Sequence, residues 1–221
     1  MFATLVLSAV ALADVPIDAG ELLGNAYTLP AKRLRLQILA PSSYGVTDEL
    51  EIKSSLLDLL GGPNAQVEYG LMRDGDRALS LNASVTALWV GEYIGGSVGG
   101  LYTLGGAEEN RLSFGADVGF AVTSGTGAVS LPLSANYELV TSPQKLWSFF
   151  ASTDAISLSS GSTLGTGAGA SWTRGWEVYR LTLGAILTDT TEVNASLVDS
   201  GFEPLGSSFL PLPYLLMWWT I

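Results

Sequence analysis

The chain has 221 residues, with 10 Lys or Arg against 21 Asp or Glu, so its formal net charge is −11. That charge repels phosphate backbones and argues against nucleic-acid binding. The sequence contains no cysteine and no histidine. It therefore lacks disulfides, the commonest general base and the commonest transition-metal ligands, and we expect neither an enzyme nor a cofactor or metal centre.

The N-terminal segment is predicted to direct export. Residues 1–13 form an apolar run that ends in a small-x-small site at residues 11–13, as secretory signal peptides do. We therefore expect a signal peptide over residues 1–13 and a single mature domain over 14–221, with little structure in 14–29. No Lys or Arg precedes the apolar run, so a first buried strand or helix remains the alternative.

Apolar and polar residues alternate with a period of two along most of the chain. In residues 111–123 the even positions from Leu112 to Val122 are apolar, whereas the odd positions from Ser113 onward are mostly small or polar. This alternation predicts a β-strand with one apolar face. The run of 13 residues is long enough to cross a bilayer, which takes ~9–11 tilted residues.

Ten segments show this pattern, a C-terminal apolar segment is predicted to be a closing strand, and one short strand is doubtful. We therefore expect about twelve strands, with ten as the other possibility. Residues 41–45 are predicted to be a turn, and Asp74-Gly75 a hairpin turn. The ten clear strands are expected at residues 33–38, 46–54, 65–71, 79–89, 94–104, 111–123, 129–139, 147–154, 163–173 and 177–188, the doubtful one at 193–197 and the closing one at 210–221.

The composition of the polar faces favours a closed barrel in a membrane over a soluble sandwich. These faces carry Ser, Gly, Thr and Asn, as a hydrated lumen does, whereas the outside of a sandwich carries charges. Trp89, Tyr93, Trp172 and Trp176 lie near strand ends, as interfacial aromatic girdles do. We expect an all-β, antiparallel, up-and-down transmembrane β-barrel; aromatics that cap a soluble core are the alternative.

The glycines of residues 165–169 do not predict a phosphate site, because no helix follows them. Gly165, Gly167 and Gly169 share one strand face. There they keep the wall thin or let another group pack against it.

The segment 28–52 resembles bacterial outer-membrane β-barrel proteins. The resemblance rests on Thr28-Leu29-Pro30, on the strand at 33–38 and on the run 44–52, which begins Tyr-Gly-Val-Thr-Asp. It implies the outer membrane of a Gram-negative bacterium as location, with the lipid bilayer and the barrel-assembly machinery as partners. In such barrels that machinery reads a C-terminal aromatic residue, and Trp219 is third from the end here.

Charged and amide side chains on the polar parity are the candidate functional residues. They are consistent with two functions: a passive channel or transporter for small polar solutes or ions, or a non-conducting structural or partner-binding protein whose interior is closed by ion pairs. The oligomeric state stays open. The lumen-lining candidates are Arg33, Arg35, Glu49, Glu51, Lys53, Glu68, Asn82, Asp117, Asn136, Glu138, Asp154 and Arg180.

Overall fold

The computed structural model describes residues 17–37, 40–55, 58–89, 93–123, 126–158, 161–176, 179–189 and 209–220. The expected signal peptide at 1–13 and the doubtful strand at 193–197 lie outside these ranges.

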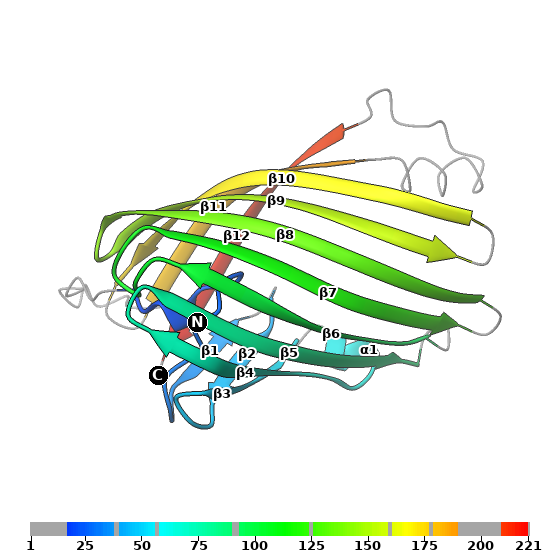
Figure 1. The fold of residues 1–221 in the computed structure, drawn as a ribbon, viewed down its shortest axis with the longest axis horizontal. Coiled ribbons are helices and arrows are strands. Elements are labelled where there is room, and N and C mark those ends of the chain that lie inside the picture. The colour runs from blue at the N-terminus through cyan, green and yellow to red at the C-terminus, as the bar shows by residue number, and fades with distance from the viewer. Residues whose placement is uncertain are drawn as a thin grey trace, which may run out of the picture.

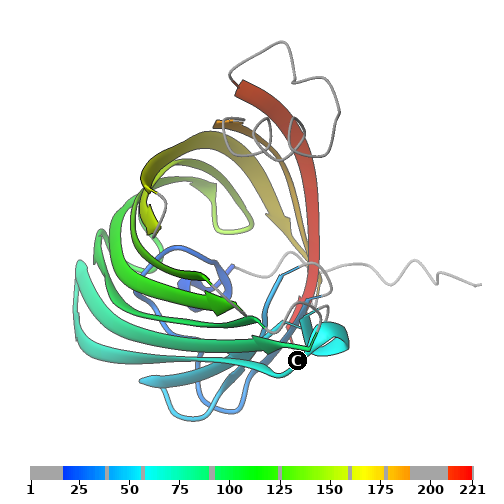
Figure 2. The ribbon, with the colours of Figure 1, turned by 90° about the vertical axis from the view of Figure 1, so that its right-hand side faces the viewer.

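The described residues form a closed antiparallel barrel of twelve strands, which confirms the predicted fold class (Figures 1 and 2). Each strand pairs with its neighbours in sequence, and β12 pairs with β1 to close the ring. The strands are β1 (Leu34–Gln37), β2 (Ser42–Gly45), β3 (Leu50–Ser54), β4 (Asn64–Asp74), β5 (Arg77–Leu88), β6 (Tyr93–Leu104), β7 (Arg111–Thr123), β8 (Thr126–Ser142), β9 (Lys145–Leu158), β10 (Gly161–Gly175), β11 (Tyr179–Asp189) and β12 (Phe209–Thr220).

The wall is uneven in height. Strands β4 to β12 have 11 to 17 residues, which is enough to cross the hydrocarbon of a bilayer. Strands β1, β2 and β3 have only 4, 4 and 5 residues. Their hairpins lie toward the end of the barrel that also holds the β4–β5 and β8–β9 turns, on the left of Figure 1. We call this the turn end and the opposite one the far end.

One of the predicted turns is wrong. Residues 41–45 were expected to reverse the chain, yet Ser42–Gly45 is β2 and pairs with both β1 and β3. Pro41 and Gly45 are turn formers, but here Pro41 precedes a four-residue strand and Gly45 is its last residue, and the reversal falls at residues 46–49. The expected turn at Asp74-Gly75 is present between β4 and β5, with Gly75 at φ 53°.

The alternation predicted for β7 is present in the structure. Leu112, Phe114, Val118 and Phe120 are exposed on the outside, whereas Ser113 and its odd-numbered neighbours point inward. The exterior is therefore apolar along the strand, as lipid contact requires.

Outward aromatic residues gather near the turn end. The rings of Trp147 and Trp172 are on directly paired positions of β9 and β10. Tyr179 packs against Trp219 across the β11–β12 pair, with ring centroids 6.0 Å apart. Such a girdle marks the level of a membrane–water interface.

The segment 17–29 lies inside the ring, as the blue ribbon in Figure 2 shows. It contains the 3₁₀ turn η1 (Ala19–Glu21), and Asp18 accepts a hydrogen bond from the Gly20 N–H at 2.9 Å. The expectation of a lead-in with little structure is therefore wrong. Its residues have no strand or helix period, and their order comes from contacts with the barrel wall.

The only α-helix of the described residues is α1 (Asp58–Gly61), one turn between β3 and β4. No helix in the described part of the chain is long and apolar enough to cross a membrane.

Candidate functional site

The segment 17–29, which we call the plug, is fixed to the wall on several sides. The Ile17 N–H donates to the carbonyl of Pro143 at 2.7 Å, in the β8–β9 turn. The Ala26 N–H donates to Thr103 Oγ1 on β6 at 2.8 Å, and the Leu29 N–H donates to Glu51 Oε2 on β3 at 3.1 Å. The plug thus crosses the interior from one side of the ring to the other.

Glu21 is the central charge of the plug and is almost fully buried. Arg180 Nε donates to its carboxylate at 2.8 Å, and Arg33 approaches it at 3.4 Å. Arg35 Nη1 donates to the Glu21 carbonyl at 2.7 Å. Burial nevertheless raises the pKa of Glu21 above its ordinary value, because desolvation of the carboxylate outweighs the attraction of Arg180.

A second cluster of buried charges lies on the inner side of strands β1, β3 and β4. Arg35 approaches Glu51 at 3.6 Å, and Lys53 approaches the same carboxylate at 3.8 Å. Lys53 also binds Glu68 at 2.5 Å, and Ser80 donates to Glu68 at 2.7 Å. Charges from β1, β3 and β4 therefore compensate one another inside the barrel, as buried charges must.

A third cluster joins the plug to β7 and β8. Arg111 Nε donates to Glu138 at 2.5 Å, and both side chains are almost fully buried. Asn136 donates to Glu138 at 3.2 Å, and Asn25 of the plug donates to it at 3.5 Å.

Tyr27 fixes the middle of the plug. Its hydroxyl donates to the Gly105 carbonyl at 2.8 Å, and Arg73 lies over its ring at 5.0 Å. Burial raises the pKa of the Tyr27 hydroxyl, so it stays a neutral donor at physiological pH.

The Tyr-Gly-Val-Thr-Asp run has a local role at the exit of the plug. Asp48 accepts hydrogen bonds from the Ala31 N–H at 2.9 Å and, through its carbonyl, from Thr28 Oγ1 at 2.6 Å. A Cβ on Gly45 would lie 2.1 Å from the Pro30 carbonyl oxygen, so the exiting chain requires glycine there. The motif thus shapes the crossing between the plug and the wall.

The structure distributes the twelve sequence candidates among three places. The turn and rim hold Glu49, which is exposed and bonds Thr47, and Arg33, whose side chain is 49% exposed. Glu49 is therefore not a lumen residue: the strand expected at 46–54 begins only at Leu50, which leaves Glu49 in the turn. The clusters around the plug hold Arg35, Glu51, Lys53, Glu68, Asn136, Glu138 and Arg180, and the far half of the interior holds Asn82, Asp117 and Asp154.

Sequence reasoning missed two charged members of the clusters. Arg111 shares the parity of Ser113, so its inward position was available from the β7 pattern. Glu21 precedes the first strand and carried no periodic signal. With these two included, carboxylates and cations balance in the clusters around the plug, whereas the far half of the interior holds the carboxylates Asp117 and Asp154.

The far half of the interior contains a polar cavity of about 530 Å³. Asp117 and Asp154 line it together with Ser, Thr and Asn side chains. The Asp117 side chain reaches across β6 toward Asn82 on β5. Gly99 lies between them, and a Cβ there would be 2.0 Å from Asp117 Oδ1.

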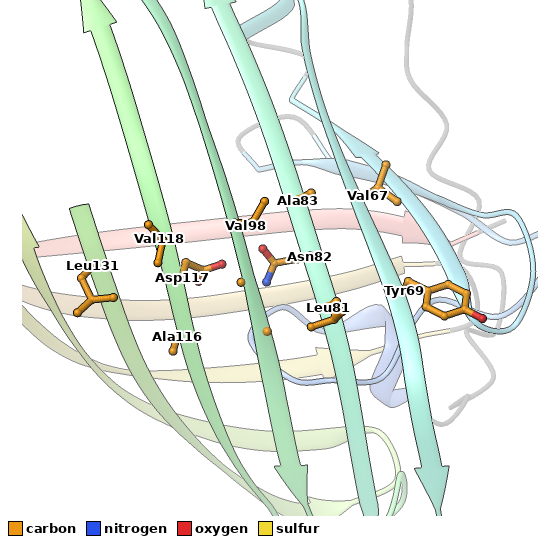
Figure 3. Close-up of a pocket in the computed structure, with 12 residues that line it drawn as sticks. Val67, Tyr69, Leu81, Asn82, Ala83, Val98, Ala116, Asp117, Val118 and Leu131 are labelled. Carbon is orange, nitrogen blue, oxygen red and sulfur yellow. The ribbon is translucent and has the colours of Figure 1, made fainter. Parts of the chain in front are cut away.

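A groove of about 610 Å³ lies on the same wall and is lined mainly by outward apolar residues (Figure 3). Val98, Val118 and Leu131 border it, and small residues such as Ala83 and Ala116 leave it shallow. Asn82 and Asp117 flank β6 in the same view. The groove faces the side where lipid would lie, so it is not a continuation of the lumen.

A third cavity, of about 480 Å³, lies between the plug and β8 to β12. Leu22 and Leu23 of the plug form one side of it, and Phe150, Tyr214 and Trp218 of the wall form another. This cavity combines apolar and polar walls.

The closed antiparallel ring with an apolar exterior defines the class: this is a transmembrane β-barrel protein of the outer-membrane type. No protein-family model matches the sequence, and no curated protein matches it.

Solved structures with a similar chain include CdiB from Acinetobacter baumannii, at 14% identity and a TM-score of 0.38, over 71% of this chain and 31% of that one. A bacterial polysaccharide outer membrane secretin has 14% identity and a TM-score of 0.46, over 86% and 69%. OmpTdeltaL8, a loop deletion mutant of an outer membrane protein of Vibrio cholerae, has 7% identity and a TM-score of 0.41, over 86% and 96%. The chain thus spans about a third of the length of CdiB.

Proposed function

We propose that this chain is an outer-membrane binding protein whose barrel does not conduct while the plug is seated. The observation that carries the proposal is the Glu21–Arg180 pair, in which a fully buried carboxylate of the plug meets a buried cation of β11 at 2.8 Å. Withdrawal of the plug would leave Arg180 without this carboxylate. If the lumen were freely permeable at rest, the plug would have to be withdrawn and Arg180 would lack the Glu21 carboxylate in the resting protein.

The contacts of the plug on three sides of the ring support the same proposal. They involve β3 through Glu51, β6 through Thr103 and β8 through Glu138. The turn end would face the periplasm, because β11 ends and β12 begins at the far end, and more residues separate these two strands in sequence than any other consecutive pair. In outer-membrane barrels the longer loops are extracellular.

Planar-bilayer recording tests the proposal. The intact protein is expected to give no conductance above the background of the bilayer, and a variant without residues 17–29 serves as the open control. Steady conductance from intact, monodisperse protein would contradict the proposal.

A channel that opens when the plug leaves is the second candidate, and the polar cavity of about 530 Å³ in the far half favours it. In that case the intact protein would conduct in discrete openings, and Arg180→Met would raise the open fraction because it removes the partner of Glu21.

A further inference from the structure

The cavity of about 480 Å³ between the plug and the wall has two buried polar atoms that face no partner in the described part of the chain. They are the acceptor Gln37 Oε1 and the donor Trp218 Nε1. Gln37 is 2% exposed and Trp218 is 4% exposed. The two residues are directly paired across β1 and β12, so the acceptor and donor come from adjacent positions of the same wall.

An unsatisfied buried donor or acceptor is costly, at about 1–3 kcal/mol each. Most buried polar groups therefore have partners, and exceptions call for an explanation. Asn136 Oδ1, on the β8 side of the same cavity, is also without a partner among the described residues. Three residues that line one cavity thus each carry a buried polar atom without a partner, which indicates a ligand that hydrogen-bonds there.

The remainder of the cavity is apolar. Phe150 and Tyr214 line it with ring centroids 6.5 Å apart, and Leu216 and Ile186 extend this surface. Leu22 and Leu23 contribute from the plug. The volume falls within the usual range for small-molecule sites, ~300–1,000 Å³, and the mixture of walls fits a molecule with an apolar chain and a polar head.

Charge selects the kind of head group. The cavity lining includes Glu21 and Glu138, which are paired with Arg180 and Arg111, but it includes no Lys or Arg among the described residues. The free groups are two acceptors and one donor. A carboxylate or phosphate would therefore meet a single donor and two like charges nearby, whereas a hydroxyl or amide can donate and accept.

We propose that this cavity binds a neutral, hydroxyl- or amide-headed amphiphile of medium chain length, with Gln37 and Trp218 as the head-group contacts. The proposal goes beyond closure of the barrel, although the plug supplies one wall of the site.

The edge of β12 indicates that the ligand comes from the membrane. On its β1 side β12 pairs only at Trp218, Trp219 and Thr220, and within the described ranges no strand pairs with residues 209–217 on that side. Pro211 and Pro213 lie in this part of β12. Proline has no N–H to donate, so it is tolerated at a sheet edge and discourages pairing there.

Isothermal titration of the full-length mature protein in amphipol, with 1-decanol and with decanoic acid at pH 8, tests the proposal. One 1-decanol per barrel is expected to bind saturably, and decanoate at least about tenfold more weakly. Trp218→Phe, which keeps an aromatic ring and removes the donor, is expected to weaken 1-decanol about threefold to tenfold, as for loss of one hydrogen bond. Trp219→Phe is the matched control, because Trp219 packs against Tyr179 on the other face of β12.

Gln37→Leu is the second variant and separates binding from folding. It removes a buried unsatisfied acceptor, so the ligand-free protein is expected to be as stable as the parent or more stable, while 1-decanol binds more weakly. A residue with a structural role alone would lose stability and leave binding unchanged.

Three results would overturn the proposal: no saturable binding, decanoate as tight as the alcohol, or equal loss in Trp218→Phe and Trp219→Phe. Arms with decanol supplied in lipid vesicles or in water distinguish entry from the membrane from entry through the lumen. Conductance of the same samples is recorded in parallel. Conductance together with saturable, Trp218-dependent binding would reject closure by the plug and retain the ligand site.

Discussion

Two glycines let aromatic rings lie flat on the inner wall. Gly169 on β10 is paired with Phe150 on β9, and Gly184 on β11 is paired with Tyr214 on β12. A Cβ would lie 2.4 Å from the Phe150 ring in the first case and 2.5 Å from the Tyr214 ring in the second. The glycine run at 165–169 therefore does let another group pack, and the space above these rings is the cavity between the plug and the wall.

Gly184→Ala is expected to push the Tyr214 ring into this cavity and to weaken 1-decanol binding. Its neighbours within reach are atoms of that ring, so the fold should survive at a cost of about 1–2 kcal/mol. Titration and urea unfolding of the same variant measure the two effects. Gly167→Ala is the control, since its Cβ would meet the Ser152 hydroxyl at an ordinary 3.4 Å; an equal effect from both would contradict this account of Gly184.

The buried pair Arg111–Glu138 should show strong coupling. Arg111→Met leaves the Glu138 carboxylate buried without its cation, and loss of one member of such a pair typically costs about 3–5 kcal/mol. The double variant Arg111→Met/Glu138→Gln removes both charges and should recover much of that loss. A double-mutant cycle of unfolding free energies measures the coupling, and additive losses would show that the pair does not act as a unit.

At the scale of single strands, β7 offers a test of facing. Val118 points outward near the middle of the strand, whereas Ala121 points inward and lines the polar cavity. Val118→Arg is expected to cost about 2–4 kcal/mol, because it places a cation in hydrocarbon. Ala121→Arg keeps its charge in the lumen and should cost less. Reversible unfolding in lipid vesicles compares the two variants. A larger loss of unfolding free energy for Ala121→Arg would mean that position 121 faces lipid and position 118 faces the lumen.

The plug should be sensitive to pH through Glu21. Its pKa in the folded protein is raised above the ordinary 4.5 by burial. Protonation therefore favours the folded, seated state: the contribution of Glu21 is fully present below pH 4.5 and is lost as pH rises through the raised pKa. Urea midpoints measured against pH should fall over this interval in the parent and stay flatter in Glu21→Gln. A midpoint that rises with pH in the parent but not in Glu21→Gln would give the opposite sign and contradict the raised pKa.

Strand facing was predictable, whereas one strand of the ring, β2, was not. The period-two pattern located the long strands, including β7 and β11, because membrane strands carry a local signal that packing does not override. The expected short strand at 193–197 lies outside the described residues, and the ring of twelve includes β2, where a turn was predicted. Four residues that follow Pro41 and end in Gly45 contain too little pattern to distinguish a strand from a turn.

The residues of the site were predictable only where they lie on strands with a period-two alternation of apolar and polar side chains. Arg35, Glu51 and Glu68 could be assigned inward from alternation, and the structure buries them. The plug has no period, so Glu21 gave no signal. Trp218 belongs to a closing strand in which both faces are apolar, and no alternation marked its indole as inward.

On the scale of the whole molecule, the low wall of β1 to β3 interrupts the membrane-spanning surface. Five residues of extended strand reach about 17 Å, against a hydrocarbon thickness of about 30 Å. The nine taller strands can cross the bilayer. The low side of the wall begins beside β12, which pairs with the short β1 only at residues 218–220. The polar plug-binding charges of β1 and β3 are confined to the turn end, where the wall is complete.

The narrow seam between β1 and β12 also bears on the kinetics of folding. It joins the first and last strands of the barrel through three paired positions, Arg35–Thr220, Leu36–Trp219 and Gln37–Trp218. Contacts between residues so distant in sequence are slow to form, because the chain loses loop-closure entropy before these contacts can stabilise it. We therefore expect the seam to form last, after Arg180 of β11 has bound Glu21 of the plug. When the protein begins to unfold, the amide hydrogens of the seam should exchange sooner than those of the β8–β9 pair.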